Sequence, residues 1–147
     1  MATVLEFYRN GLVVRHRGLV TDEEMLETER GIYRHAYPAP LEFQVVDLSQ
    51  VTDFRASPET MRDVGRMDRD MARALKRQYV AVIAPSQGRA MAIVWQAWAT
   101  EGGRSPSLVT TKVNTIDEAQ DWLCGQGIAV DLTTPPDSTL DVSSGNQ

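Results

Sequence analysis

Hydrophobic residues occur along this chain in short runs that alternate with longer stretches of helical periodicity. The first two runs, residues 4–8 and 12–17, are joined by Asn10 and Gly11. Asn-Gly between two apolar runs is the strongest short-range signal of a β-hairpin, because both turn positions favour a positive φ. The chain is therefore predicted to begin with a hairpin whose tight turn contains Asn10 and Gly11.

Three helices are predicted from capping residues that precede apolar residues at helical spacing. Thr21 with Glu24 forms a capping box, in which the hydroxyl accepts the N–H of the third helical residue. Thr115 with Glu118 repeats this arrangement. In the middle helix, Ser57 is the expected N-cap and a proline occupies the first turn. The apolar stripe of the middle helix comprises Met61, Val64, Met67, Met71 and Leu75.

Continuous apolar runs at residues 43–48, 79–84 and 108–113 are typical of buried strands. A further helix, apolar nearly all round, is expected at residues 89–100. This order predicts an α/β fold (mixed α+β) with a mixed, mostly parallel sheet of about five strands, starting with a β-hairpin, and about four helices.

The chain is predicted to form one domain over residues 1–125, followed by a tail at residues 126–147. Residues 133–147 consist mainly of Pro, Ser, Thr, Asp and Gly, a composition that does not bury a core. We therefore expect the tail to be flexible or packed on the surface.

Charge and composition narrow the classes of partner. The 15 basic and 20 acidic residues give a net charge of −5, which disfavours nucleic acid. The basic residues at positions 62–77 alternate with Asp63, Asp68 and Asp70, and this pattern predicts a salt-bridged outer helix face. A lone cysteine, Cys124, indicates a reducing compartment, and no apolar run reaches the length of a membrane span. We predict a cytoplasmic protein without nucleic-acid binding or membrane insertion.

No set of residues predicts catalysis or metal binding. Adjacent carboxylates such as Asp22 and Glu23 lie in first helical turns, where the helix dipole favours acidic residues. His16 and His35 are the only histidines, and neither has further ligands at metal-binding spacing. We therefore expect no enzyme, no cofactor and no metal.

Four short motifs follow one another in an informative order. They read Gly-Leu-Val-Thr at residues 18–21, Val-Asp-Leu-Ser at 46–49, Tyr-Val-Ala-Val at 79–82 and Ala-Gln-Asp-Trp-Leu at 119–123. Together with the element order, they resemble the STAS superfamily (sulfate transporter and anti-sigma-factor antagonist domains), and within it the SpoIIAA-like branch of small bacterial proteins. The resemblance implies a regulatory or protein-interaction module.

The segment before the middle helix is the regulatory position of that superfamily. In regulatory members it reads Asp-Ser-Ser-Gly, and phosphorylation of the second serine breaks a complex with a partner kinase. Here the same positions read Arg-Ala-Ser-Pro, from Arg55 to Pro58, so that only Ser57 matches. The resemblance makes Ser57 a candidate phospho-switch, with Arg55 as the partner of a phosphate. The residues by themselves describe an ordinary helix N-cap.

The apolar helix expected at residues 89–100 lacks a polar outer face. One side carries Met91, Val94, Trp95 and Trp98. These side chains belong to the core, to a self-association surface or to the wall of an apolar pocket. The sequence thus supports a non-enzymatic interaction module of unknown pathway, which binds a protein partner or forms a homodimer. The alternative is a carrier of a small apolar, lipid-like ligand in a pocket similar to that of CRAL-TRIO domains.

Overall fold

The predicted hairpin opens the sheet in the computed structural model, which describes residues 2–36, 41–74, 77–84, 98 and 107–142. Strands β1 (Ala2–Tyr8) and β2 (Gly11–Val20) pair antiparallel. Gly11 is already part of β2, opposite Tyr8, so the turn consists of Arg9 and Asn10. Gly11 also has no positive φ. The hairpin is confirmed, but its predicted turn is wrong by one residue.

The sheet has six strands in the order β5-β4-β3-β2-β1-β6. The parallel part consists of β2, β3 (Phe43–Phe54), β4 (Gln78–Ile83) and β5 (Leu108–Val113). The antiparallel part consists of β2, β1 and β6 (Ser138–Val142). The mixed, mostly parallel sheet is thus confirmed, and β6 is a strand that the sequence did not predict.

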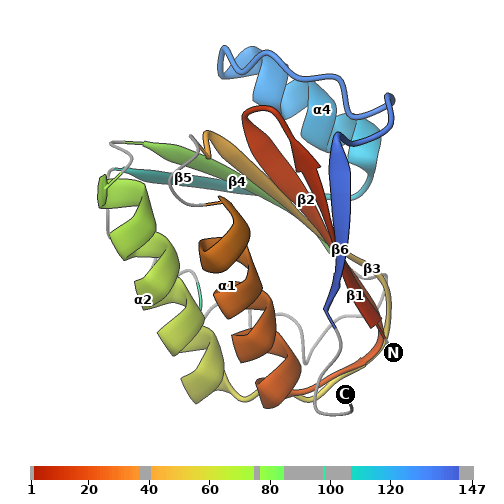
Figure 1. Cartoon of the computed structure of the whole chain (residues 1–147), viewed down its shortest axis with the longest axis vertical. Coiled ribbons are helices and arrows are strands. Elements are labelled where there is room, and N and C mark those ends of the chain that lie inside the picture. Colours follow the sequence, from red (N-terminus) through yellow and green to blue (C-terminus); the bar gives the residue numbers. More distant parts are fainter. Residues whose placement is uncertain (1, 37–40, 75–76, 85–97, 99–106, 143–147) are drawn as a thin grey trace.

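Two helices cover one face of the sheet, and a third covers the other (Figure 1). Helices α1 (Asp22–Ala36) and α2 (Pro58–Ala74) lie side by side, and α4 (Ile116–Gly125) lies opposite. The described residues therefore contain three helices where the sequence predicts about four. The remaining predicted helix, at residues 89–100, lies outside the described residues except for Trp98.

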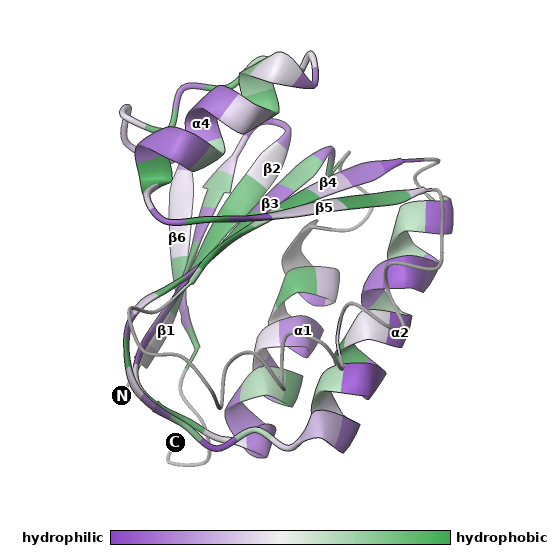
Figure 2. Cartoon of the chain, turned by 180° about the vertical axis from the view of Figure 1, so that it is seen from behind, coloured by the Kyte–Doolittle hydropathy of each residue, from purple (hydrophilic) through white to green (hydrophobic). Residues whose placement is uncertain are grey.

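Each face of the sheet has its own hydrophobic core. Val80 and Val82 of β4 pack with Met61 and Val64 of α2. On the other face, the strand residues Val13, Phe43 and Val45 pack with Ala119 and Leu123 of α4. Figure 2 shows mainly hydrophobic strands in the middle of the sheet, whereas α2 alternates between hydrophilic and hydrophobic residues. The central strands are buried on both faces, as their continuous apolar runs predict.

The chain after α4 returns to the sheet. Ile128 and Leu132 are buried against the core beneath α4. Strand β6 then pairs with β1, and its partly buried Leu140 and Val142 pack near α1. Both side chains lie close to Gly31 of α1, within 4.0 Å of the position that a Cβ would take there. A segment of low overall hydropathy therefore completes one edge of the sheet with a few well-placed apolar residues.

Candidate functional site

The junction between β3 and α2 is held by hydrogen bonds to both α1 and α2. The hydroxyl of Ser57 accepts the backbone N–H of Thr60 at 3.1 Å, and its carbonyl accepts the N–H of Met61 at 3.0 Å. The N–H of Ser57 donates to Oδ1 of Asp22, in the first turn of α1, at 2.6 Å. Ser57 is therefore the N-cap of α2, and its backbone ties the starts of the two helices together.

Arg55 lies on the surface of the same junction. Its guanidinium donates to Oδ2 of Asp53 at 2.8 Å, and its backbone N–H donates to the carbonyl of Val20. Among the hydrogen bonds and ion pairs of the described residues, none joins Arg55 to Ser57. The structure thus brings the two candidate switch residues to one loop without pairing their side chains.

Replacing Ser57 by alanine is expected to lower the free energy of unfolding by about 1 kcal/mol, because the N–H of Thr60 loses its acceptor. Ser57→Asn retains a capping oxygen without adding a charge beside Asp22 and is expected to unfold at nearly the wild-type urea concentration. Chemical denaturation followed by far-UV circular dichroism measures both variants. Equal destabilisation by alanine and asparagine would show that the cap is not the source of the effect.

Of the four apolar residues predicted to form an interface or a pocket, only Trp98 can be placed. Met91, Val94 and Trp95 lie outside the described residues. Trp98 is buried, and its Nε1–H donates to Oδ2 of Asp68 at 2.8 Å. Trp98 also lines a cavity between the sheet and helices α1 and α2. Trp98 is also part of the hydrophobic core, so its position fits both a core side chain and a pocket wall.

The cavity has a volume of about 50 Å³. This space exceeds the volume that one water molecule needs, about 10–15 Å³, and is well below the roughly 150 Å³ that holds a benzene molecule. Most of its wall is apolar and comprises, among others, Met25, Ile32, Val46, Met61 and Val64. The polar side chains in the wall are His16, Thr28, Glu29, Gln44 and Asp68.

Two buried carboxyl groups face this cavity, one from each helix. Glu29 of α1 is 5% exposed and Asp68 of α2 is 4% exposed. Burial, together with the neighbouring carboxyl group of Asp68, raises the pKa of Glu29 well above its ordinary value. Burial raises the pKa of Asp68 to about 6, against the opposing effects of the neighbouring Glu29 and Tyr33 side chains and of the N–H that Trp98 donates. Two carboxyl groups buried side by side repel when both are ionised, which favours a state in which they hold one proton between them.

Some buried oxygen atoms at this carboxyl pair lack a hydrogen-bond partner. Oε2 of Glu29, Oδ1 of Asp68 and Oη of Tyr33 are all buried and have no partner that meets hydrogen-bond geometry. The side chains interact electrostatically, since each carboxyl group contributes to the raised pKa of Tyr33. Unsatisfied buried oxygens of this kind are rare in folded proteins and indicate a proton, a water molecule or a ligand.

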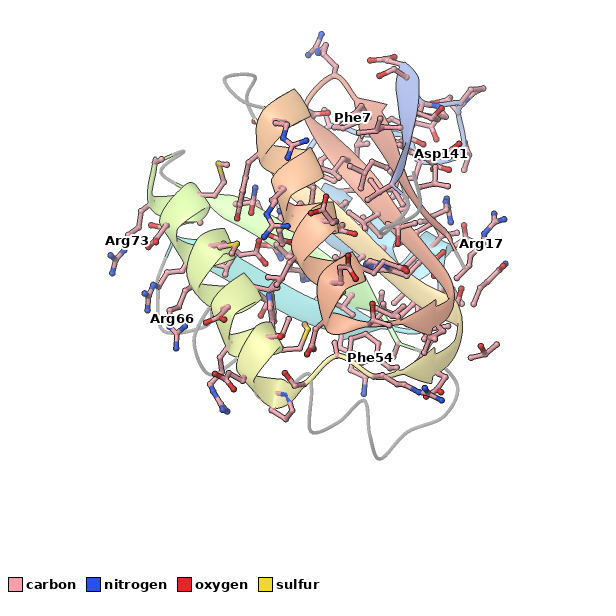
Figure 3. The ribbon with its side chains drawn as sticks, turned by 60° about the horizontal axis from the view of Figure 1, so that its bottom comes forward. Phe7, Arg17, Phe54, Arg66, Arg73 and Asp141 are labelled. Carbon is pink, nitrogen blue, oxygen red and sulfur yellow. The ribbon has the colours of Figure 1, made fainter. Side chains whose placement is uncertain are left out.

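The sequence analysis did not find this pair. It predicted Asp68 on a solvated, salt-bridged face of α2, and this prediction is wrong. The buried residues of α2 include Val64, Asp68 and Ala72, which follow one another at intervals of four. A signal was present in the sequence, because Asp68 and Glu29 each occupy a helical position in line with apolar residues. The outer face of α2 does carry the expected arginines, with Arg66 paired to Asp63, and Figure 3 shows Arg66 and Arg73 pointing away from the sheet.

A second buried polar network lies at the edge of the same cavity. His16 of β2 is 2% exposed, and its Nδ1 lies 2.8 Å from Oγ1 of Thr3. The Thr3 hydroxyl donates to Oε2 of Glu24 at 2.9 Å, so it accepts its other hydrogen bond from Nδ1–H of His16. Burial lowers the pKa of His16 to about 4. The imidazole is therefore neutral at physiological pH and adds no positive charge to the cavity wall.

The described residues do not form a metal centre. They contain no group of three or more histidine, cysteine, aspartate or glutamate side chains placed to hold an ion. Cys124 is exposed on α4, and Nε2 of Gln120 donates to its Sγ at 3.3 Å. Within the part of the chain that is described, the cavity and the β3–α2 junction are therefore the two candidate sites.

No model of a protein family matches the sequence, and no curated protein sequence matches it. Solved structures that are similar in fold include two of SpoIIAA. The anti-sigma factor antagonist SpoIIAA in its unphosphorylated form matches with a TM-score of 0.56 and 18% sequence identity, over 84% of this chain and 97% of that chain. The Bacillus cell fate determinant SpoIIAA in its phosphorylated form matches with a TM-score of 0.53 and 20% identity, over 83% and 99%.

Both matches extend over nearly the whole SpoIIAA chain and most of this one. Their sequence identities are so low that the matches establish a common fold and nothing further. Within the described residues, no helix combines the length and the apolar character that a transmembrane span requires. The chain therefore has the fold of the anti-sigma factor antagonist SpoIIAA, as the resemblance of its motifs and element order predicted.

Proposed function

We propose that this chain is a non-enzymatic, STAS-like regulatory module that binds a partner protein at the β3–α2 junction. The fold supports this proposal, because it is shared with an anti-sigma factor antagonist whose structure is known in unphosphorylated and phosphorylated forms. The observation that carries the proposal is the junction itself, which is exposed and yet fixed by the hydrogen bonds of Ser57 to both helices. A loop held in this way loses little conformational entropy when a partner binds.

The surface around Ser57 is polar and carries charges of both signs. Its exposed residues are Thr52, Asp53, Arg55, Pro58, Glu59 and Arg62. Mixed charges at an interface orient a partner and exclude wrong ones more than they add affinity. This surface therefore suits a specific partner with a complementary polar patch.

Ser57 is the regulated position in the proposed module. A phosphate on its hydroxyl would stand close to the carboxylate of Asp22, whose Oδ1 accepts the Ser57 N–H at 2.6 Å. Like charges at this distance repel, and the phosphate would also occupy the oxygen that caps α2. Phosphorylation would thereby loosen the tie between α1 and α2 at the surface that the partner contacts.

The carrier of a lipid-like ligand is the second candidate function, and the placement of Trp98 in a cavity wall favours it. The cavity volume of about 50 Å³ argues against an acyl chain, because even benzene occupies a cavity of roughly 150 Å³. A lipid would require α1 and α2 to separate from the sheet. The partner-binding module is therefore better supported.

Site-specific photo-crosslinking in cells that express the protein tests the proposal. A benzophenone side chain in place of the exposed Glu59 is expected to give one discrete product, and the same group in place of the exposed Asp121 on α4 is the matched control. Arg55→Glu in the Glu59 background is expected to reduce the yield, since it reverses a charge at the junction. A product of twice the chain mass would identify the partner as a second copy. Equal labelling at both positions, or none at Glu59, would contradict the proposal.

A further inference from the structure

Among the described residues, no basic group acts on the buried carboxyl pair, although such pairs normally have a positive charge beside them. Buried carboxylates in proteins are paired with a cation, bound to a metal or neutralised. Among the described residues, the groups that act on Glu29 and Asp68 are each other, Tyr33 and Trp98, and none of these is basic. A single proton shared between the two carboxyl groups compensates one of the two negative charges. One charge therefore remains in a largely apolar cavity.

The geometry points to a missing donor as well as a missing charge. Glu29 and Asp68 are each more than nine-tenths buried and line the cavity, with Oε2 and Oδ1 lacking partners. The other oxygen of Asp68 already accepts from Nε1–H of Trp98. Tyr33 Oη is a third buried oxygen without a partner beside the pair. A group with several N–H donors on one atom would satisfy these oxygens together.

We propose that the cavity between the sheet and helices α1 and α2 binds a small alkylammonium cation, whose ammonium group bridges the carboxyl groups of Glu29 and Asp68. The alkyl part would contact the apolar wall that includes Ile32, Met61 and Val64. The volume of about 50 Å³ limits the ligand to a few carbon atoms. This site lies inside the fold and does not depend on partner binding at the junction.

Binding of the cation compensates the charge that the shared proton leaves. The pair with one proton carries one negative charge and the ligand carries one positive charge, so the occupied site is neutral and no proton is released. Below the pKa of Asp68, about 6, the pair holds a second proton, which binding releases to solvent. Among the described residues, the other titratable groups that act on the pair or line the cavity with it are Tyr33 on α1 and His16 on β2, and both are neutral at physiological pH. Binding is therefore expected to strengthen as the pH rises through about 6.

Nuclear magnetic resonance of the ¹⁵N-labelled full chain tests the site, with the indole N–H of Trp98 as the reporter. Trp98→Phe assigns this resonance among the three tryptophans. Titration with ethylammonium chloride at constant ionic strength is expected to shift it to saturation. Ethanol, a neutral molecule of similar size, is expected to bind more than about tenfold more weakly, because it leaves the buried charge unpaired. Equal binding of ethanol and ethylammonium, or a shift that does not saturate, would overturn the proposal.

Variants of Glu29 and Asp68 test whether these two side chains bind the ammonium group. Glu29→Gln and Asp68→Asn are each expected to weaken ethylammonium binding by more than about tenfold, whereas Glu23→Gln, at an exposed position of α1, is the matched control and leaves it unchanged. Two variants are used because either one tests the site if the other variant fails to fold. Calorimetry in buffers of different ionisation enthalpy is expected to show release of about one proton per ligand at pH 5 and of none at pH 7.5 in the wild type. Retained affinity in a folded Glu29→Gln or Asp68→Asn variant would place the amine elsewhere.

Discussion

Asp68→Asn is expected to raise the free energy of unfolding at pH 8 by up to about 3 kcal/mol, and to leave it nearly unchanged at pH 4. The pKa of Asp68 is about 6 in the folded chain and has an ordinary value of 3.8. Between these values the folded state binds a proton that the unfolded state has released, so stability falls as the pH rises through 6. Asparagine carries no charge at any pH and retains an oxygen that accepts from Trp98. The variant therefore avoids the cost of a buried carboxylate above pH 6.

Urea denaturation of both proteins between pH 4 and pH 8 measures this difference. His16 is not among the groups that act on Asp68, so its contribution cancels in the comparison, whereas removal of the Asp68 charge also lowers the pKa of Glu29 and thereby adds to the gain in stability. Asp63→Asn is the matched control, since Asp63 lies on the outer face of α2 and pairs with Arg66. We expect this control to change stability by less than about 1 kcal/mol, as is typical of surface ion pairs. A gain for Asp68→Asn that is the same at pH 4 and pH 8 would exclude the ionisation of Asp68 as its cause.

Gly11→Ala is expected to destabilise the protein by about 3 kcal/mol, through steric overlap in the middle of the sheet. A Cβ at this position would lie 2.3 Å from Cδ2 of Phe43 and 2.5 Å from the carbonyl oxygen of Phe43. Phe43 is fully buried and is the parallel partner of Gly11 in the pairing of β2 with β3. Because the second clash is with backbone, a rotation of the ring cannot relieve it. The strands would have to separate where the sheet is held on both faces.

Gly125→Ala is the matched control for this substitution. Gly125 ends α4, and a Cβ there meets no atom within 4 Å. Alanine is also the better helix former, so this variant is expected to be as stable as the wild type or slightly more stable. Thermal and urea unfolding of the three proteins provide the comparison. Similar losses for both variants would mean that glycine matters here for reasons other than the contact with Phe43.

Local signals predicted the elements of this fold well. Each of the caps at Thr21, Ser57 and Thr115 accepts the expected N–H. Each capping signal extends over only three or four residues. Over so short a segment, few backbone conformations compete with the start of a helix. The hairpin shows the limit of such reading. Asn10-Gly11 correctly predicted a reversal of the chain, but Gly11 is required because Phe43, distant in sequence, fills the space of a side chain.

The candidate sites needed information that no local pattern contains. Glu29 and Asp68 are 39 positions apart, and only the packing of α1 beside α2 brings their carboxyl groups together. Each of them has acidic and basic neighbours in sequence, a pattern that is typical of a helix on the protein surface. Their position in line with apolar residues was the available signal, and the many arginines of α2 obscured it. Ser57 was found as a cap, whereas its link to Asp22 depends on the same helix pair.

The predicted behaviour of Asp68 and the proposed amine site have a common physical origin. A carboxylate that lowers stability at neutral pH is retained in many proteins because it binds or reacts with something. Asp68→Asn is therefore expected to give a protein that is more stable at pH 8 and no longer binds ethylammonium. A cation that enters the cavity would offset the same cost by supplying the missing charge.

The pairing of β6 with β1 sets the order in which the molecule can be completed during synthesis. Thr3 pairs with Val142, so that one edge of the sheet joins the two ends of the described chain. While a ribosome is still translating the residues in between, β1 has β2 on one side and exposed N–H and C=O groups on the other. The nascent chain consequently has an open strand edge until residues 138–142 emerge. Ribosome-bound intermediates of this protein therefore have an unpaired strand edge, a feature that makes partly folded chains prone to aggregate.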